Sequence, residues 1–78
     1  MVQKIRLHTA EDLRQFMHLA WDCSSDIGVH TADGDIADAK SILGLIALDY
    51  TEPVMVVTES QQFLKKIAKW CVSEGESV

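Results

Sequence analysis

The spacing of apolar residues switches between the period of a strand and the period of a helix, and this switching constrains the fold more than any other feature. Within residues 2–7, Ile5 and Leu7 alternate with Lys4 and Arg6, which is typical of a half-buried strand. Apolar residues then recur at helical spacing in one stripe, which contains Leu13, Phe16, Met17, Ala20 and Trp21. Because each apolar face must be covered by another element, the pattern predicts a layered domain of strands and helices.

A hairpin follows the first helix. Ile27, Val29 and Thr31 share one face of the expected second strand. Residues 32–35 contain an Asp-Gly pair, which is a strong signal for the turn of a hairpin. The sequence therefore predicts a short return strand over residues 36–39.

The second half of the chain repeats the alternation. Ser41 is expected to cap a short helix that extends to Leu48. Residues 54–57, with the sequence Val-Met-Val-Val, are expected to form a strand that is buried on both faces. Thr58 and Gln61 form a capping box before the last helix. The apolar stripe of that helix contains Phe63, Leu64, Ile67, Ala68, Trp70 and Cys71.

The elements follow the order βαββαβα within a single domain over residues 1–78. This order predicts an α+β open-faced sandwich, in which three helices cover one face of a four-stranded antiparallel sheet. Hydrophobic residues make up 47% of the chain and charged residues 24%, which is typical of a globular domain. Residues 74–78 are expected to form a polar tail.

The charge of the chain excludes several classes of function. The 12 acidic and 7 basic side chains give a net charge of −5. With so few basic groups to neutralise phosphates, we expect neither a nucleic acid nor an anionic membrane surface as a partner. No apolar run is long enough to span a membrane, and residues 1–9 lack the apolar core of a signal peptide. A cytoplasmic location is therefore expected.

The cysteines and histidines indicate neither a metal site nor a cofactor. Cys23 and Cys71 can form at most one bridge, and no Cys/His cluster has the spacing of a zinc site. In the predicted topology the first and last helices run antiparallel, so these cysteines lie at opposite ends and are expected to stay unpaired. His18 is expected at the surface of the first helix and His30 on the open face of the sheet, and neither has a spacing that suggests a metal. We predict no metal and no cofactor.

Residues 39–48, Ala-Lys-Ser-Ile-Leu-Gly-Leu-Ile-Ala-Leu, are similar to a segment of a known family. They resemble the AKSI(L/M)G(L/V)xxL segment of HPr, the histidine-containing phosphocarrier of the bacterial sugar phosphotransferase system. The order of elements agrees over residues 2–73, as does the register of Gln15, Phe16 and Ile27. The resemblance implies the same open-faced fold and a bacterial protein related to sugar phosphotransfer.

The phosphotransfer motif of this family is absent. In the family a Gly-(Ile/Leu)-His-Ala-Arg-Pro-Ala motif opens the first helix, and enzyme I phosphorylates its histidine at the expense of phosphoenolpyruvate. When the chain is aligned from Ile27, Thr9 occupies the histidine position, Glu11 the arginine position and Asp12 the proline position. Thr9 is a favourable helix N-cap, whereas Glu11 and Asp12 would repel a phosphoryl group. The loop before the motif and the connector over residues 49–53, which lie side by side at the active centre in the family, are also shorter here.

Two side chains remain candidates for carrying a phosphoryl group. His8 stands one position before the empty slot, and we consider it as a displaced acceptor; the alternative is an exposed histidine at the end of a strand. Ser41 matches the serine that a dedicated kinase phosphorylates in Gram-positive relatives, where the modification gates the carrier and recruits a regulator. The alternative for Ser41 is a role as helix N-cap only.

The short helix after Ser41 is too apolar to bury all of its side chains. Leu45 and Leu48 are expected to be the buried pair. Ile42, Leu43 and Ile46 then form an exposed ridge, here called the α-ridge, which resembles the apolar surface that the family presents to its partners. The alternative is that some of these side chains belong to the core.

These features predict an HPr-like protein with a degenerate phosphotransfer site, which acts as a regulatory or protein-interaction module rather than as an enzyme. Phosphotransferase components or a regulator are its expected partners, and the chain itself is expected to be a monomer. A divergent phosphocarrier that relays a phosphoryl group from enzyme I through His8 is the alternative. A third interpretation is that only the fold is shared, because a fold does not determine a function.

Overall fold

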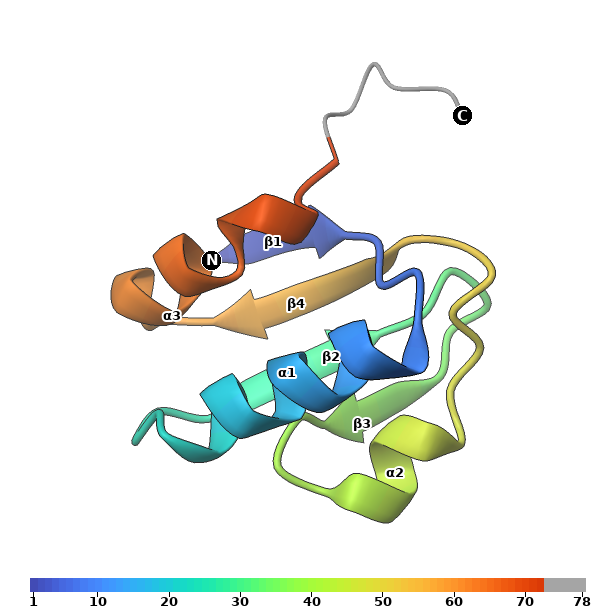
Figure 1. Ribbon diagram of the computed structural model, residues 1–78, viewed down its shortest axis with the longest axis horizontal. Helices are drawn as coiled ribbons and strands as arrows, with labels where there is room; N and C mark the ends of the chain where they lie inside the picture. The colour runs from blue at the N-terminus through green and yellow to red at the C-terminus, as the bar shows by residue number, and fades with distance from the viewer. Residues whose placement is uncertain (73–78) are drawn as a thin grey trace.

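A computed structural model describes residues 1–72, so the predicted polar tail over residues 74–78 lies outside the described residues. Within residues 1–72, four strands, three helices and a short 3-10 helix follow one another (Figure 1). They are β1 (Val2–Ile5), α1 (Ala10–Trp21), β2 (Ile27–His30), β3 (Ile36–Asp38), α2 (Ile42–Ile46), β4 (Val54–Thr58), α3 (Gln61–Lys66) and η1 (Ala68–Trp70). The predicted order of elements is confirmed.

The four strands form one antiparallel sheet in the order β1-β4-β2-β3. The strand β4 therefore lies inside the sheet, where Val57 stands opposite Val2 of β1 and Gly28 of β2. In Figure 1 the helices α1 and α3 lie in front of the sheet, and α2 lies beside the edge strand β3. This arrangement is the α+β open-faced sandwich that the sequence predicts.

The core lies between the sheet and the helices. Its largest fully buried side chains are Phe16, Phe63, Ile5, Ile27, Leu45, Ile67, Val29, Val54 and Val56. The Phe16 ring meets the rings of Phe63 and Trp70 edge-on, with centroids 5.6 and 6.3 Å away. These aromatic contacts join α1 to α3 and η1. They stabilise the packing, since edge-to-face pairs add to the free energy of apolar burial.

The expectation that residues 54–57 are buried on both faces is wrong. Val54 and Val56 face the helices and are buried, whereas Met55 and Val57 face the other side and are half-buried. The physical reason is that the helices cover only one face, and no element within residues 1–72 covers the other.

The capping box predicted before the last helix is also wrong. Ser60 is the N-cap of α3, since its Oγ accepts a hydrogen bond from the backbone N–H of Phe63 at 3.1 Å. Thr58 instead remains in β4, where it pairs with Ile27. Its buried hydroxyl donates to the carbonyl oxygen of Asp26 at 2.9 Å. Strand pairing thus overrides the local capping signal, and the helix itself is divided into α3 and η1.

The helix α2 ends at Ile46, earlier than predicted. Ser41 caps it as expected, because Oγ accepts from the backbone N–H of Gly44 at 3.2 Å. The helix packs on β3: a Cβ at Gly44 would meet the Cβ of Ala37 at 3.4 Å, an ordinary contact distance, and the capping Oγ of Ser41 more tightly, at 3.2 Å. This packing carries Leu45 into the core and leaves the opposite side of α2 outside.

Candidate functional site

An open hollow of about 400 Å³ lies where α1 begins. The end of β1, the first turn of α1 and the connector before β4 line it, with Leu7, His8, Thr9, Leu13, Tyr50 and Thr51 among the lining residues. Arg6 joins β1 to the connector, because its Nη1 donates a hydrogen bond to the carbonyl oxygen of Thr51 at 3.3 Å. The two segments that form the phosphotransfer centre in the resembled family are therefore neighbours in this chain.

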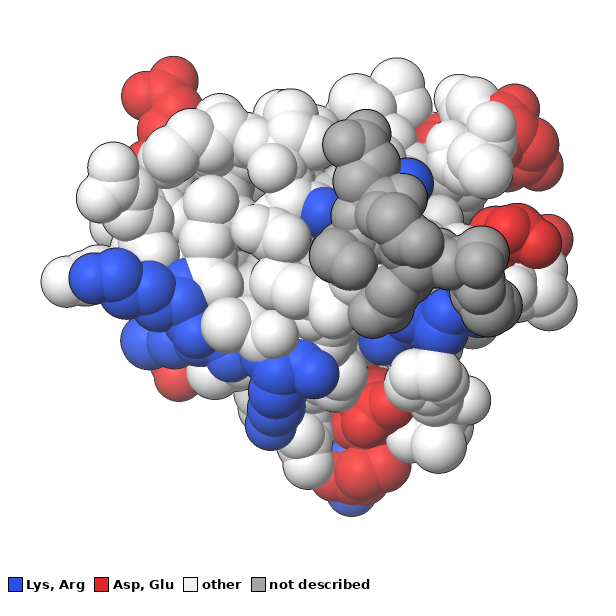
Figure 2. Space-filling view, turned by 90° about the horizontal axis from the view of Figure 1, so that it is seen from above, with Lys and Arg blue, Asp and Glu red and all other residues white. Residues whose placement is uncertain are grey.

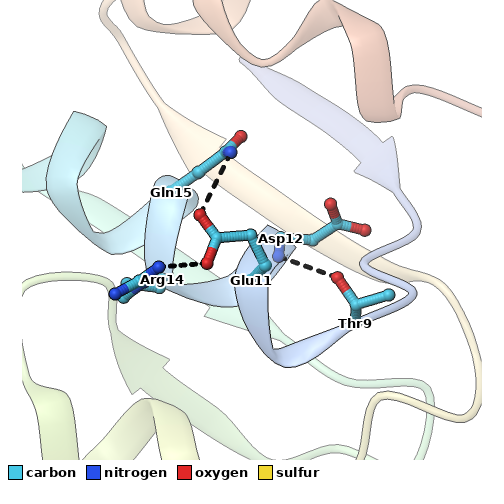
Figure 3. A network of polar contacts seen from close by, with 5 residues as sticks. All are labelled: Thr9, Glu11, Asp12, Arg14 and Gln15. Atoms are coloured by element: carbon cyan, nitrogen blue, oxygen red, sulfur yellow. Dashed lines mark hydrogen bonds and ion pairs between the residues drawn. The ribbon is translucent and has the colours of Figure 1, made fainter.

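The side chains of Thr9 and Asp12 each accept one backbone hydrogen bond at the start of α1. Thr9 Oγ1 accepts from the backbone N–H of Asp12 at 3.0 Å, as expected of an N-cap residue (Figure 3). Asp12 Oδ2 accepts in turn from the backbone N–H of His8 at 3.0 Å. This second hydrogen bond lowers the pKa of the Asp12 carboxyl, which is therefore ionised at neutral pH. The first turn of α1 therefore carries the negative charge of the Asp12 carboxylate.

Glu11 brings a second negative charge to the same turn. Its carboxylate accepts hydrogen bonds from Arg14 and, at 3.3 Å, from Nε2 of Gln15 (Figure 3). The contact with Arg14 is the main cause of the lowered pKa of Glu11. Arg14 is directed at Glu11 and points away from Thr9, so its guanidinium is not placed to receive a phosphoryl group there.

The three histidines occupy separate places. His8 is exposed beside the first turn of α1, and its backbone N–H donates to the Asp12 carboxylate. His18 is exposed on α1, and its ring meets the Trp21 ring edge-on at 5.5 Å between centroids. His30 lies half-buried on the uncovered face of the sheet. The surface position of His18 and the place of His30 on the uncovered face agree with what the sequence predicts.

Tyr50 links the hollow to α2, although the sequence pattern assigns it no role. Its hydroxyl donates to the carbonyl oxygen of Leu45 at 2.6 Å, and burial of the ring raises the pKa of Tyr50 to about 12. The neighbouring Asp49 shapes the turn, because its Oδ1 accepts from the backbone N–H of Thr51 at 2.9 Å. A single aromatic residue within a polar connector is the only sequence signal that could have identified Tyr50.

The α-ridge is exposed as predicted. The side chains of Ile42, Leu43 and Ile46 are 44%, 83% and 60% exposed. On the opposite side of α2, Leu45 is fully buried, whereas Leu48 lies beyond the end of α2 and is half-buried against the core, so the predicted buried pair is confirmed for Leu45 only. Three large apolar side chains on a helix of five residues form a surface that an isolated chain leaves in water.

Trp21 extends this apolar surface from the end of α1. The side chain is 45% exposed, and its Nε1 donates to the carbonyl oxygen of Lys40 at 3.3 Å. Lys40 lies two residues before α2, so this hydrogen bond holds the indole beside the segment that leads into α2. The helical stripe places Trp21 on the core side, but α1 ends at this residue, where the core no longer covers it.

Ser41 and the cysteines lie where the sequence places them. Ser41 is exposed at the start of α2, and its oxygen serves as the helix cap. Cys23 and Cys71 are free and lie after α1 and after η1. Burial alone would raise the pKa of the Cys23 thiol, but hydrogen bonds from the Ser25 backbone and the Ser60 hydroxyl lower it overall.

Positive charge gathers at one edge of this acidic molecule. Lys65, Lys66 and Lys69 are exposed on α3 and η1. Figure 2, which looks down on this edge, shows basic side chains across the visible face and acidic side chains towards its margins. Lys69 is held in place, since its Nζ lies 4.7 Å from the ring centroid of Trp70 and donates to Gln15 at 3.1 Å. This basic surface is separate from the α-ridge, because η1 adjoins β1 and α2 adjoins the opposite edge strand, β3.

A scan against protein-family models gives no match for this chain, and a search of curated proteins gives none. Within residues 1–72, no three His, Cys, Asp or Glu side chains gather closely enough to hold a metal ion. Among the helices of the same residues, none is both long and apolar enough to cross a membrane.

Proposed function

We propose that this chain is an HPr-like protein of the bacterial sugar phosphotransferase system that has lost phosphotransfer and serves as a protein-interaction or regulatory module. The observation that carries the interaction role is the α-ridge, formed by Ile42, Leu43 and Ile46. A water-exposed apolar surface of this kind is typical of a site that binds another protein. The expected partners are phosphotransferase components, enzyme I among them, or a regulator.

The start of α1 supports the loss of phosphotransfer. A phosphocarrier needs a nucleophilic imidazole and a nearby cation for the phosphoryl oxygens. Here Thr9 is committed to capping, and Asp12 already accepts the backbone N–H of His8. Glu11 adds a further negative charge, and Arg14 is bound to it. A phosphoryl group at this helix start would meet two carboxylates instead of a guanidinium.

The first experiment incubates the chain with phosphoenolpyruvate and enzyme I from the same organism and then measures the intact mass. No added phosphoryl group is expected, because the acceptor and its cation are both missing. The variant His8→Ala is measured in parallel. One acid-labile phosphoryl group on the native chain that is absent from His8→Ala would refute the proposal and support the relay through His8.

The second experiment measures binding of enzyme I by calorimetric titration, with the native chain and with Leu43→Asp. The native chain is expected to bind, and Leu43→Asp is expected to lower the affinity at least tenfold, as is common for a residue at the centre of an interface. Ala68→Asp is the matched control, because Ala68 is exposed on η1, which adjoins the edge strand β1, away from α2 and from the uncovered face of the sheet. Equal losses from both variants would contradict a specific role of the α-ridge.

Ser41 is part of the same proposal as a regulatory phosphorylation site. Ser41 is exposed and directly precedes α2, so a phosphate on its oxygen would lie beside the α-ridge. A dianionic phosphate next to Ile42 would change the charge of the surface that a partner contacts. Intact-mass measurement after incubation with the serine kinase, with Ser41→Ala as control, tests this assignment.

A further inference from the structure

The uncovered face of the sheet is apolar along its centre. Two cross-strand rows run over it, one formed by Val2, Val57, Gly28 and Asp38 and the other by Lys4, Met55, His30 and Ile36. Val2 and Ile36 are 55% and 68% exposed, and Met55 and Val57 are half-buried. In an antiparallel sheet with one face in water, each strand normally carries polar residues on that face. The inner strand β4 has no polar residue there.

Charged side chains stand at two diagonal corners of this face. Lys4 lies on the edge strand β1 in one row, and Asp38 lies on the opposite edge strand β3 in the other row. A shallow hollow, widely open to solvent, lies at the Asp38 corner, and Asp26, Gly28 and Ile36 also line it. Gly28 has no side chain to fill this space, so two carboxylates border an open hollow.

Neither Lys4 nor Asp38 is fully engaged by other groups of the described residues, so both charges can contact another molecule. Oδ1 of Asp38 accepts from the backbone N–H of Lys40 at 2.9 Å, and its other oxygen has no partner within residues 1–72. Lys4 shares a second hollow with Glu52 and Met55, but no ion pair joins Lys4 to an acidic group of the described residues. Lys4, with the Glu52 carboxylate in its hollow, and the acidic hollow at Asp38 thus lie at opposite corners of this face.

We propose that this face binds a second copy of the same chain, sheet against sheet, around a two-fold axis. An axis that lies in the interface at right angles to the Lys4–Asp38 diagonal brings Lys4 of each copy over Asp38 of the other. The Lys4 ammonium then enters the hollow between Asp38 and Asp26 of the second copy. Each contact occurs twice, as in any two-fold interface, and the Met55 and Val57 side chains meet near the axis.

This pairing explains the composition of β4. The run Val-Met-Val-Val is typical of a strand that is covered on both faces, and the second copy covers the face that the helices leave open. The face is only four strands wide, and each chain carries a charge of −5. An interface of this small size, formed against charge repulsion, is weak. The chain is therefore a monomer at low concentration and pairs as the concentration rises.

The test is sedimentation equilibrium of the native chain and of two charge variants over a wide range of concentration. The native chain is expected to show concentration-dependent dimers. Lys4→Glu and Asp38→Lys are each expected to lower the association constant by roughly tenfold, because two attractive pairs become repulsive in each dimer. An equimolar mixture of the two variants is expected to associate more tightly than either alone. In a mixed dimer the carboxylate introduced by Lys4→Glu meets the ammonium introduced by Asp38→Lys, so both pairs are attractive again.

Two further variants keep the test independent of net charge and of folding. Lys65→Glu makes the same charge change on α3, away from the sheet face, and is expected to reduce association far less than Lys4→Glu. Gly28→Val fills the acidic hollow and is expected to weaken association. A Cβ at Gly28 meets its nearest atom, Nε2 of His30, at an ordinary 3.6 Å, so the fold accommodates it. A native chain that stays monomeric at every concentration, or a mixture that associates no better than its components, overturns the proposal.

Discussion

The variant Leu43→Asp separates a surface role of α2 from a core role. Leu43 is 83% exposed, so little of its side chain leaves the protein interior when it is replaced. Full burial of a leucine is worth about 1.5–3 kcal/mol, and the buried sixth therefore corresponds to at most about 0.5 kcal/mol. Leu43 is the second residue of α2, where an acidic side chain gains about 0.3–1 kcal/mol from the helix dipole. We expect a change in the free energy of unfolding within about 0.5 kcal/mol of zero.

The matched comparison is Leu45→Ala on the same helix. Leu45 is fully buried against the sheet, so its truncation removes apolar contacts and leaves a cavity. Such a change costs about 2–5 kcal/mol. For a domain of 78 residues the whole free energy of unfolding is about 4–12 kcal/mol, so this single truncation removes a large part of it.

Urea denaturation measures both variants, with circular dichroism and the fluorescence of the buried Trp70 as probes. The midpoint for Leu43→Asp should coincide with that of the native chain, and the midpoint for Leu45→Ala should fall clearly. A loss of more than about 2 kcal/mol for Leu43→Asp would place Leu43 in the core. That result would refute both the exposure of the α-ridge and the binding role based on it.

Two further predictions concern hydrogen bonds of Asp12 and Tyr50, which lie close to the hollow at the start of α1. Asp12 has a folded-state pKa below its ordinary value of 3.8, so its contribution to stability is present above that pH and is lost as the pH falls through the folded-state pKa. Urea denaturation at neutral pH and below pH 3.8 should therefore show a smaller acid-induced loss for Asp12→Asn than for the native chain; an identical loss would contradict the assignment. Tyr50→Phe removes the hydrogen bond to Leu45 and should cost about 1 kcal/mol, which lowers the melting temperature by about 4–8 °C. An unchanged melting temperature in calorimetry would show that this bond adds nothing to the attachment of α2.

Much of the fold could be predicted because its signals are local. The alternation of Ile5 and Leu7 and the helical stripe around Phe16 each depend on residues a few positions apart. The caps at Thr9 and Ser41 are equally local, and both are confirmed. The turn is a further case, since Gly34 adopts a φ of 99°, which glycine reaches without strain.

The errors occur where a distant element competes with a local signal. Thr58 and Gln61 satisfy the pattern of a capping box, but pairing with β2 keeps Thr58 in the strand, and Ser60 becomes the cap. The helical stripe includes Trp21, yet its exposure depends on how far the core extends beyond α1. The position of Tyr50 depends on the packing of the connector against α2, where its hydroxyl donates to the carbonyl oxygen of Leu45.

The candidate site divides in the same way. The resemblance to HPr predicts that Thr9, Glu11 and Asp12 stand at the positions of a phosphotransfer motif, and the apolar pattern predicted the exposed side of α2. Only the structure showed that Asp12 binds the backbone of His8 and that Trp21 stands beside the start of α2. Hydrogen bonds between side chains and backbone depend on orientation, which residue spacing does not specify.

The sequence by itself determined the kind and order of the elements, because periodicity and capping are set by neighbours along the chain. The tertiary structure decided the strand order β1-β4-β2-β3 and which face of each strand is covered. Val56 and Val57 are identical residues, yet one is fully buried and the other half-buried. The physical reason is that burial depends on what packs against a residue, and the helices pack against only one face of the sheet.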